Sequence, residues 1–141
     1  MKKTVLGLAA LTVLAFTACK KDEGNSSSQT NRILGKWKFL STIDVVMDYK
    51  KQTTTSDTLL YTNSYKDFRK DGYVYSYEKT ANEETYDTLP YKVSGTWVIT
   101  SYPDGEKDSA GIGTLTDTTL SLHYTFANDD FFVENSEYYH R

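Results

Sequence analysis

The sequence predicts an all-β fold, an antiparallel up-and-down β-barrel of about eight strands. Apolar and polar residues alternate with a period of two after Arg32, and no window there has apolar residues at helical spacing. Turn signals containing glycine or aspartate separate these runs. Tyrosine and threonine, which suit a pleated and half-buried surface, are abundant. Because the runs are evenly spaced, we expect consecutive hairpins that close on themselves.

The expected strands follow one another at short intervals. They cover residues 33–43, 45–50, 57–65, 66–78, 85–93, 95–101, 110–116, 118–126 and 130–139. One of the two early strands is expected to be continuous with its neighbour, and the segment 66–78 bends at its own turn. Lys70-Asp71-Gly72 and Pro103-Asp104-Gly105 supply the glycine of a tight reversal, and Thr116-Asp117-Thr118 is a third turn.

The interior of such a barrel is expected to be rich in large side chains. The alternation assigns to the inner face Phe39, Tyr73, Tyr75, Tyr91, Trp97, Leu120, Leu122 and Tyr124. Eight strands enclose a space that side chains can fill or that can hold one small ligand. Inward tyrosine hydroxyls need hydrogen-bond partners, which a polar ligand or ordered water can supply. The sequence is compatible with a filled interior and with a small amphipathic pocket.

The N-terminus has the three parts of a secretory signal. Lys2 and Lys3 precede an apolar run that ends at Phe16, and small residues follow it up to Cys19, the single cysteine. The apolar run is shorter than the roughly 20 residues that span a bilayer. A cysteine at this place resembles the lipobox of bacterial lipoproteins, in which the thiol is acylated and the chain is cut before it. The alternative is an ordinary signal peptide with a free thiol.

This resemblance implies three regions and a location. Residues 1–18 would be a signal peptide, residues 19–31 an acylated cysteine with a flexible tether, and residues 32–141 the barrel domain. The protein would then be lipid-anchored in a Gram-negative outer membrane, on its periplasmic face or at the cell surface. Lys21-Asp22-Glu23 resembles a short tag that sends some such lipoproteins to the surface, and a solvated linker is the alternative. Without residues 1–18, 14 Lys+Arg stand against 19 Asp+Glu, which does not suit nucleic acid.

The segment Gly35-Lys36-Trp37, at the start of the first strand, resembles the lipocalin signature, and Gly95-Thr96-Trp97 has similar spacing. The resemblance implies that Trp37 plugs the closed end of a barrel, that Gly35 lets the backbone pass close by, and that Arg141 is the candidate for the arginine that covers the tryptophan. The expected ligand contacts are Tyr73, Tyr75, Tyr91, Trp97 and Tyr124.

We expect the barrel to bind a small apolar or amphipathic molecule. The alternative is a solid barrel that engages a protein or a glycan through its loops, with Tyr138 and Tyr139 as exposed aromatic residues.

We expect no catalytic residues, no metal and no cofactor. His123 and His140 are the only histidines, too few for a zinc site and too isolated for a nucleophilic triad. Asp104, Glu106 and Asp108 resemble part of a calcium loop, but Gly105 is misplaced for one.

Four Asp-Ser/Thr pairs resemble the site for O-glycan addition on exported proteins of some Gram-negative bacteria. Their hydroxyl residues are Thr58, Thr88, Ser109 and Thr118. The alternative is that these pairs are turn-to-strand entries.

Overall fold

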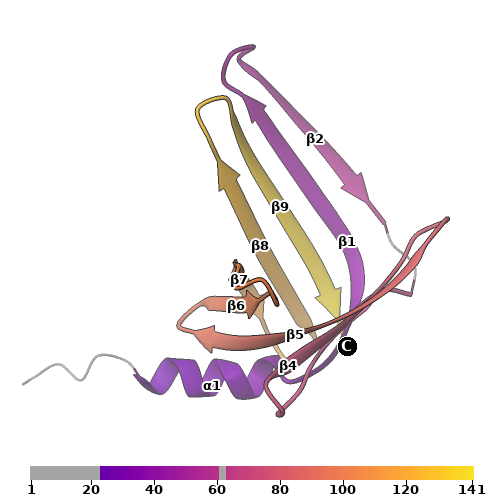
Figure 1. The fold of residues 1–141 in the computed structure, drawn as a ribbon, viewed down its shortest axis with the longest axis vertical. Helices are drawn as coiled ribbons and strands as arrows, with labels where there is room; N and C mark the ends of the chain where they lie inside the picture. The colour runs from indigo at the N-terminus through magenta and orange to yellow at the C-terminus, as the bar shows by residue number, and fades with distance from the viewer. Residues whose placement is uncertain (1–22, 61–62) are drawn as a thin grey trace, which may run out of the picture.

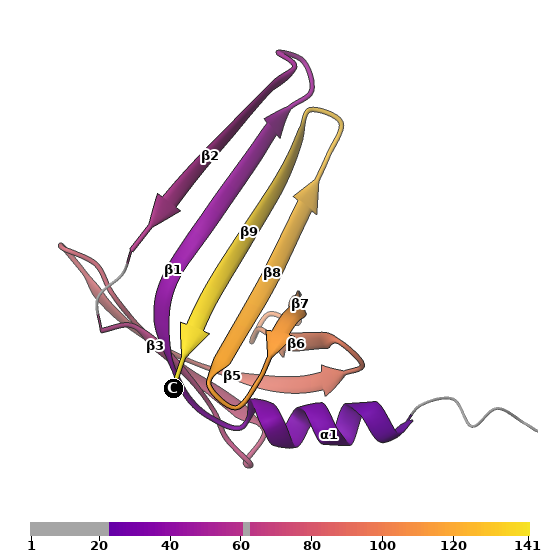
Figure 2. The same cartoon turned by 180° about the vertical axis from the view of Figure 1, so that it is seen from behind.

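The computed structural model describes residues 23–60 and 63–141, and their side chains from residue 28 onward (Figures 1 and 2). Cys19 and the predicted signal peptide lie outside the described residues. The described chain is nearly all β and contains a closed antiparallel barrel of eight strands, which confirms the predicted fold class. Its elements are α1 (Glu23–Ile33), β1 (Gly35–Asp48), β2 (Thr53–Leu59), β3 (Tyr65–Phe68), β4 (Tyr73–Lys79), β5 (Glu84–Ser94), β6 (Trp97–Ser101), β7 (Lys107–Leu115), β8 (Thr119–Ala127) and β9 (Phe131–His140).

The barrel closes because β1 pairs on both of its sides. Each strand from β3 to β9 pairs with the next one along the chain, and β9 returns to pair with β1 from Lys38–His140 to Asp48–Phe131. On its other side, the first residues of β1 pair with β3 and its later residues pair with β2. The strand β2 is therefore an addition outside the closed barrel, and the two predicted early strands are the single strand β1.

Four strands extend beyond the rest of the barrel as a projecting sheet, in the order β2, β1, β9 and β8 (Figure 1). The register explains the projection. Strand β7 pairs with β8 only as far as His123, whereas β9 continues to pair with β8 as far as Ala127. Beyond His123, β8 therefore has a partner strand on only one of its two edges, and that partner is β9.

Helix α1 corrects the prediction of a flexible tether over residues 19–31, because most of that segment is helical and lies beside one end of the barrel (Figure 2). Ile33, its only apolar side chain, is fully buried, and the Arg32 guanidinium donates to the carbonyl of Leu115 at 2.5 Å. Contacts with the barrel stabilise a helix that has no apolar periodicity of its own. This helix is neither long nor apolar enough to cross a membrane.

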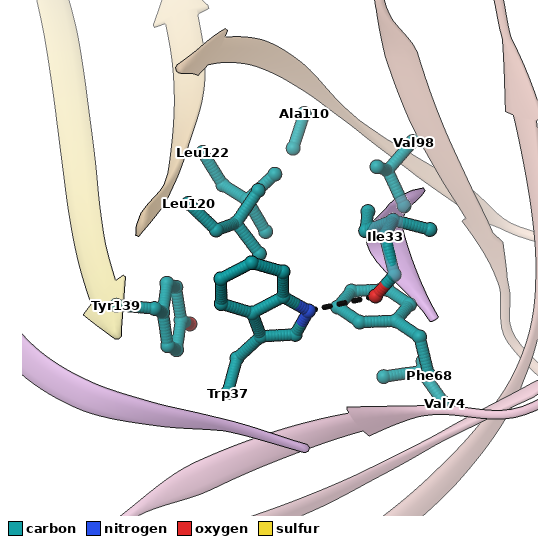
Figure 3. Packing of buried hydrophobic residues seen from close by; sticks show 9 residues of the cluster. All are labelled: Ile33, Trp37, Phe68, Val74, Val98, Ala110, Leu120, Leu122 and Tyr139. Atoms are coloured by element: carbon teal, nitrogen blue, oxygen red, sulfur yellow. Dashed lines mark hydrogen bonds between the residues drawn. The ribbon is translucent and has the colours of Figure 1, made fainter. Parts of the chain in front are cut away.

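The hydrophobic core lies at the end of the barrel that α1 covers (Figure 3). Its buried members are Ile33, Trp37, Phe68, Val74, Val98, Ala110, Leu120, Leu122 and Tyr139. Burying a side chain of this size contributes roughly 1.5–3 kcal/mol. This cluster therefore supplies much of the stability of the fold and closes one end of the barrel.

Candidate functional site

Trp37 and Arg141 together close the end of the barrel. Trp37 is fully buried, and its indole N–H donates to the carbonyl of Ile33 at 2.7 Å (Figure 3). The Arg141 guanidinium lies 4.2 Å from the centre of the indole ring. It also donates to the carbonyls of Leu34 at 2.7 Å and Asp117 at 2.6 Å. The C-terminal arginine thus covers the tryptophan and ties three segments of the chain together.

Gly35 makes room for this arrangement. Its φ is +118°, a conformation that other residues rarely adopt. A Cβ at this position would also lie 3.2 Å from Nη1 of Arg141. A glycine two residues before the tryptophan therefore leaves space for the guanidinium that covers the ring.

The inner face of the barrel changes from apolar to polar with distance from this closed end. The apolar positions nearest the core are Phe68, Val74, Leu89, Val98, Ala110 and Leu122. Two residues farther along the same strands lie Lys66, Ser76, Asp87, Thr100, Asp108 and Tyr124, all of which line a cavity. Side chains two residues apart lie on the same face of a strand. On each of these strands, the change from apolar to polar side chains therefore occurs on the face that points into the barrel.

The cavity has a volume of about 520 Å³, within the range of small-molecule binding sites. Phe68, Val74 and Leu122 form part of its apolar floor, where it meets the core. A neighbouring cavity of about 220 Å³ shares Asn135 and two glutamates with it. The barrel is therefore hollow above the core, with one apolar and one polar region inside.

A polar network from three strands forms the deep wall of the cavity. The Lys66 ammonium of β3 lies 2.8 Å from a carboxylate oxygen of Glu137 in β9. The hydroxyl of Tyr139 donates to the same carboxylate at 2.7 Å, and Lys66 donates to the hydroxyl of Tyr124 in β8 at 3.4 Å. The network balances its one positive charge against one negative charge.

The surroundings of Lys66 and Tyr124 raise the pKa of both groups. Burial acts to lower the pKa of Lys66, but the oxygen atoms of Tyr139, Tyr124 and Glu137 outweigh burial and raise that pKa well above its ordinary value. Burial raises the pKa of Tyr124 to about 12, although the Lys66 ammonium acts in the opposite direction. Lys66 is therefore charged and Tyr124 neutral at neutral pH.

The outer part of the cavity is acidic. Glu78, Asp87 and Asp108 line it, and all three are exposed to solvent. Within the described residues, none of the three forms an ion pair, and Lys66 is the only cation among the lining residues. Four carboxylates, including that of Glu137, face one ammonium, so the lining has a formal charge of −3.

Of the five predicted ligand contacts, the structure places Tyr124 on the cavity lining. The inward orientation predicted for Tyr73, Tyr75 and Trp97 was wrong, because the alternate residues of their strands line the cavity. The ring of Trp97 lies over Gly111 on the outer face, and this side chain is 48% exposed. The closely packed core leaves the smaller residues of these strands on the inside.

Tyr91 packs against the core as its predicted inward orientation requires, but it does not line the cavity, and Tyr139 is not exposed as expected. Tyr91 packs edge-on against Phe68 with ring centroids 5.0 Å apart, at the closed end and away from the cavity lining. Tyr139, expected as an exposed aromatic residue, is 1% exposed and packs edge-on against Phe39. Both tyrosines therefore stabilise the core.

Sequence reasoning missed Lys66, Asp87, Asp108 and Glu137 as cavity residues. The signal that could have found them is a charged residue two positions from an apolar core residue, here Phe68, Leu89, Ala110 and Tyr139, on the same face of a strand. The predicted inner face named no residue of β3, β7 or β9, and on β5 it named only Tyr91, so these four charges were not assigned to the interior.

His123 lies in a polar cluster on the outer face of β8. Its ring nitrogens contact the hydroxyls of Ser136 at 2.8 Å and Ser121 at 3.3 Å, and Glu134 lies 3.8 Å away. None of these four side chains lines the cavity. The cluster is thus separate from the candidate site.

The four possible glycosylation residues are all exposed. Thr58, Thr88 and Ser109 lie within strands, and Thr118 lies in the turn between β7 and β8. The interpretation as turn-to-strand entries therefore does not apply to Thr58 and Thr88, where the preceding aspartate instead accepts the backbone N–H of the threonine.

In comparisons with models of protein families and with curated proteins, no family model and no curated protein matches this chain. The closed barrel is compatible with the lipocalin-like fold that the sequence predicts.

Proposed function

We propose that this protein is a lipid-anchored, non-catalytic binding protein that holds one small amphipathic molecule inside its barrel. The observation that carries the proposal is the cavity of about 520 Å³, with an apolar floor and a polar wall. An amphipathic molecule would bury its apolar part against Phe68, Val74 and Leu122 and keep its polar part against the polar residues farther from the core, such as Thr100 and Asp108. A hollow interior argues against the alternative of a solid barrel.

A second candidate function is supported by a row of three aromatic rings, Tyr65, Tyr77 and Tyr86, of which only Tyr86 also lines the cavity. The rings of Tyr65 and Tyr77 lie 5.5 Å apart, and those of Tyr77 and Tyr86 lie 4.7 Å apart. Tyr86 is 75% exposed. Such a row suits stacking against the faces of sugar rings, so the protein would bind a glycan through its strands rather than its loops.

Fluorescence of a neutral apolar probe, N-phenyl-naphthylamine, tests the first proposal on the chain from Lys20 onward, which contains every described element. We expect a saturable increase in fluorescence with the unmodified chain. Thr100→Trp should abolish it, because Thr100 lines the cavity and a tryptophan there would fill the space. Ser101→Trp is the matched control, since Ser101 is the next residue of β6 and does not line the cavity.

Two results would contradict binding in the barrel. One is an increase that never saturates, and the other is equal binding by the two tryptophan variants. Binding of glycans that is lost in Tyr77→Ser, at a residue of the row that does not line the cavity, and kept in Thr100→Trp would instead support the second candidate function.

A further inference from the structure

The geometry points to a positively charged ligand: an organic cation, such as an amine or an ammonium compound, with an apolar body. This inference rests on the proposed function and specifies its ligand class. The apolar body would occupy the floor of the cavity, and the cationic group would lie at the acidic outer part.

The charges that line the cavity are unequal. Glu137 and Lys66 are 2.8 Å apart and neutralise each other at the deep wall. Glu78, Asp87 and Asp108 remain without an ion-pair partner among the described residues. A cation that enters the cavity therefore gains attraction from three carboxylates without displacing an existing pair.

Aromatic rings stand beside these carboxylates. Tyr102 and Tyr86 both line the cavity, and the hydroxyl of Tyr102 donates to Asp108 at 3.1 Å. Asp87 lies on β5 and Asp108 on β7, with the strand β6 between them. An organic cation inside the cavity, against the inner face of β5, β6 and β7, can contact the face of a tyrosine ring while a carboxylate balances its charge.

An anionic ligand fits the same cavity poorly. Its charge would lie among three carboxylates in the outer part. To reach Lys66, it would have to compete with Glu137 for an ammonium that already has a partner at 2.8 Å. The cavity therefore discriminates against anions by repulsion as well as favouring cations by attraction.

Three probes with one apolar body test the inference: naphthylmethylamine, naphthylmethanol and naphthoate, which are cationic, neutral and anionic at neutral pH. Their binding to the full-length chain in phosphatidylcholine nanodiscs is measured by calorimetry, with empty nanodiscs as the blank. We expect the amine to bind about threefold or more tighter than the alcohol, and the carboxylate to bind most weakly, as partly exposed ion pairs predict. The preference for the amine should decrease as salt is added.

The double variant Asp87→Asn, Asp108→Asn should bring the affinities for amine and alcohol to within about twofold. The control is Asp104→Asn, Asp129→Asn, which removes the same charge from exposed positions outside the cavity and should keep the preference. Tightest binding of the alcohol or the carboxylate would overturn the inference and leave the proposed function intact, as would an equal loss in the control. Absence of binding by all three probes would overturn both.

Discussion

Arg141 brings the two ends of the domain together. Its guanidinium covers Trp37 and donates to carbonyls of Leu34 and Asp117, so one side chain satisfies backbone groups from the start of β1 and from the turn before β8. Charged donors form the stronger class of hydrogen bond. Arg141 therefore has the structural role that the resemblance to the lipocalin signature implied for it.

Arg141→Ala should lower the free energy of unfolding by about 2 kcal/mol, because it removes hydrogen bonds from a charged donor. Urea denaturation followed by tryptophan fluorescence measures this loss. Arg69→Ala is the matched control, since Arg69 is an exposed arginine that also stacks on an aromatic ring, but its ring, that of Tyr75, lies outside the buried core. A loss in Arg141→Ala no larger than that in the control would contradict the role of Arg141 as a cover for Trp37.

At the scale of the element, α1 and β4 show how contacts override local pattern. Helix α1 is polar along its length except for Ile33, and it is held by that one buried side chain and by the Arg32 contact with β7. Strand β4 has large aromatic residues at alternate positions, yet Val74 and Ser76 are the ones that face the interior. In both elements, the space available in the barrel determines which side chains are buried.

Ile33→Ala should destabilise the protein by about 3 kcal/mol, as the loss of a fully buried isoleucine does. The side chain packs in the same cluster as Trp37, so the docking of α1 should weaken with it. Ile43→Ala, at a half-buried position of β1, is the control and should cost about 1 kcal/mol because less apolar surface is lost. Urea denaturation of both variants gives the comparison, and equal costs would show that α1 does not contribute to closing the barrel.

At the scale of the molecule, Ile33 of α1 packs into the core at the closed end of the barrel, and the polar part of the cavity lies on the other side of that core. Helix α1 lies at the closed end, and the inner faces of the strands become polar in the direction away from it. Only three residues separate Cys19 from the start of α1, a span of at most roughly 15 Å. A lipid at Cys19 would therefore hold the closed end near the membrane and leave the acidic part of the cavity farther from it.

Cys19→Ala should move the protein from the membrane fraction to the soluble fraction, because two or three acyl chains are needed for firm attachment. Fractionation of the native host followed by immunoblotting measures the distribution. Ser28→Ala, a neutral change in α1, is the control and should leave the protein with the membrane. Retention of the Cys19→Ala protein after a carbonate wash would refute the lipid anchor.

The sequence by itself determined the class of the fold. Alternation along a strand and the residues of tight turns are local properties, so residues 32–141 indicated a closed antiparallel meander before any contact was known. The role of Gly35 and Trp37 at the closed end was predicted only through the resemblance of Gly35-Lys36-Trp37 to the lipocalin signature.

Only the tertiary structure decided which side chains line the interior. Tyr73 and Trp97 lie on strands whose two faces both carry residues that can be buried. The residues that alternate with Tyr73 and Trp97 line the cavity, because the core packs inside the closed barrel only with that face turned inward. The same holds for the acidic cavity, since Asp87 and Asp108 come from strands that meet only through β6. Charges distant in sequence form one site only after the barrel closes, so no local pattern could reveal it.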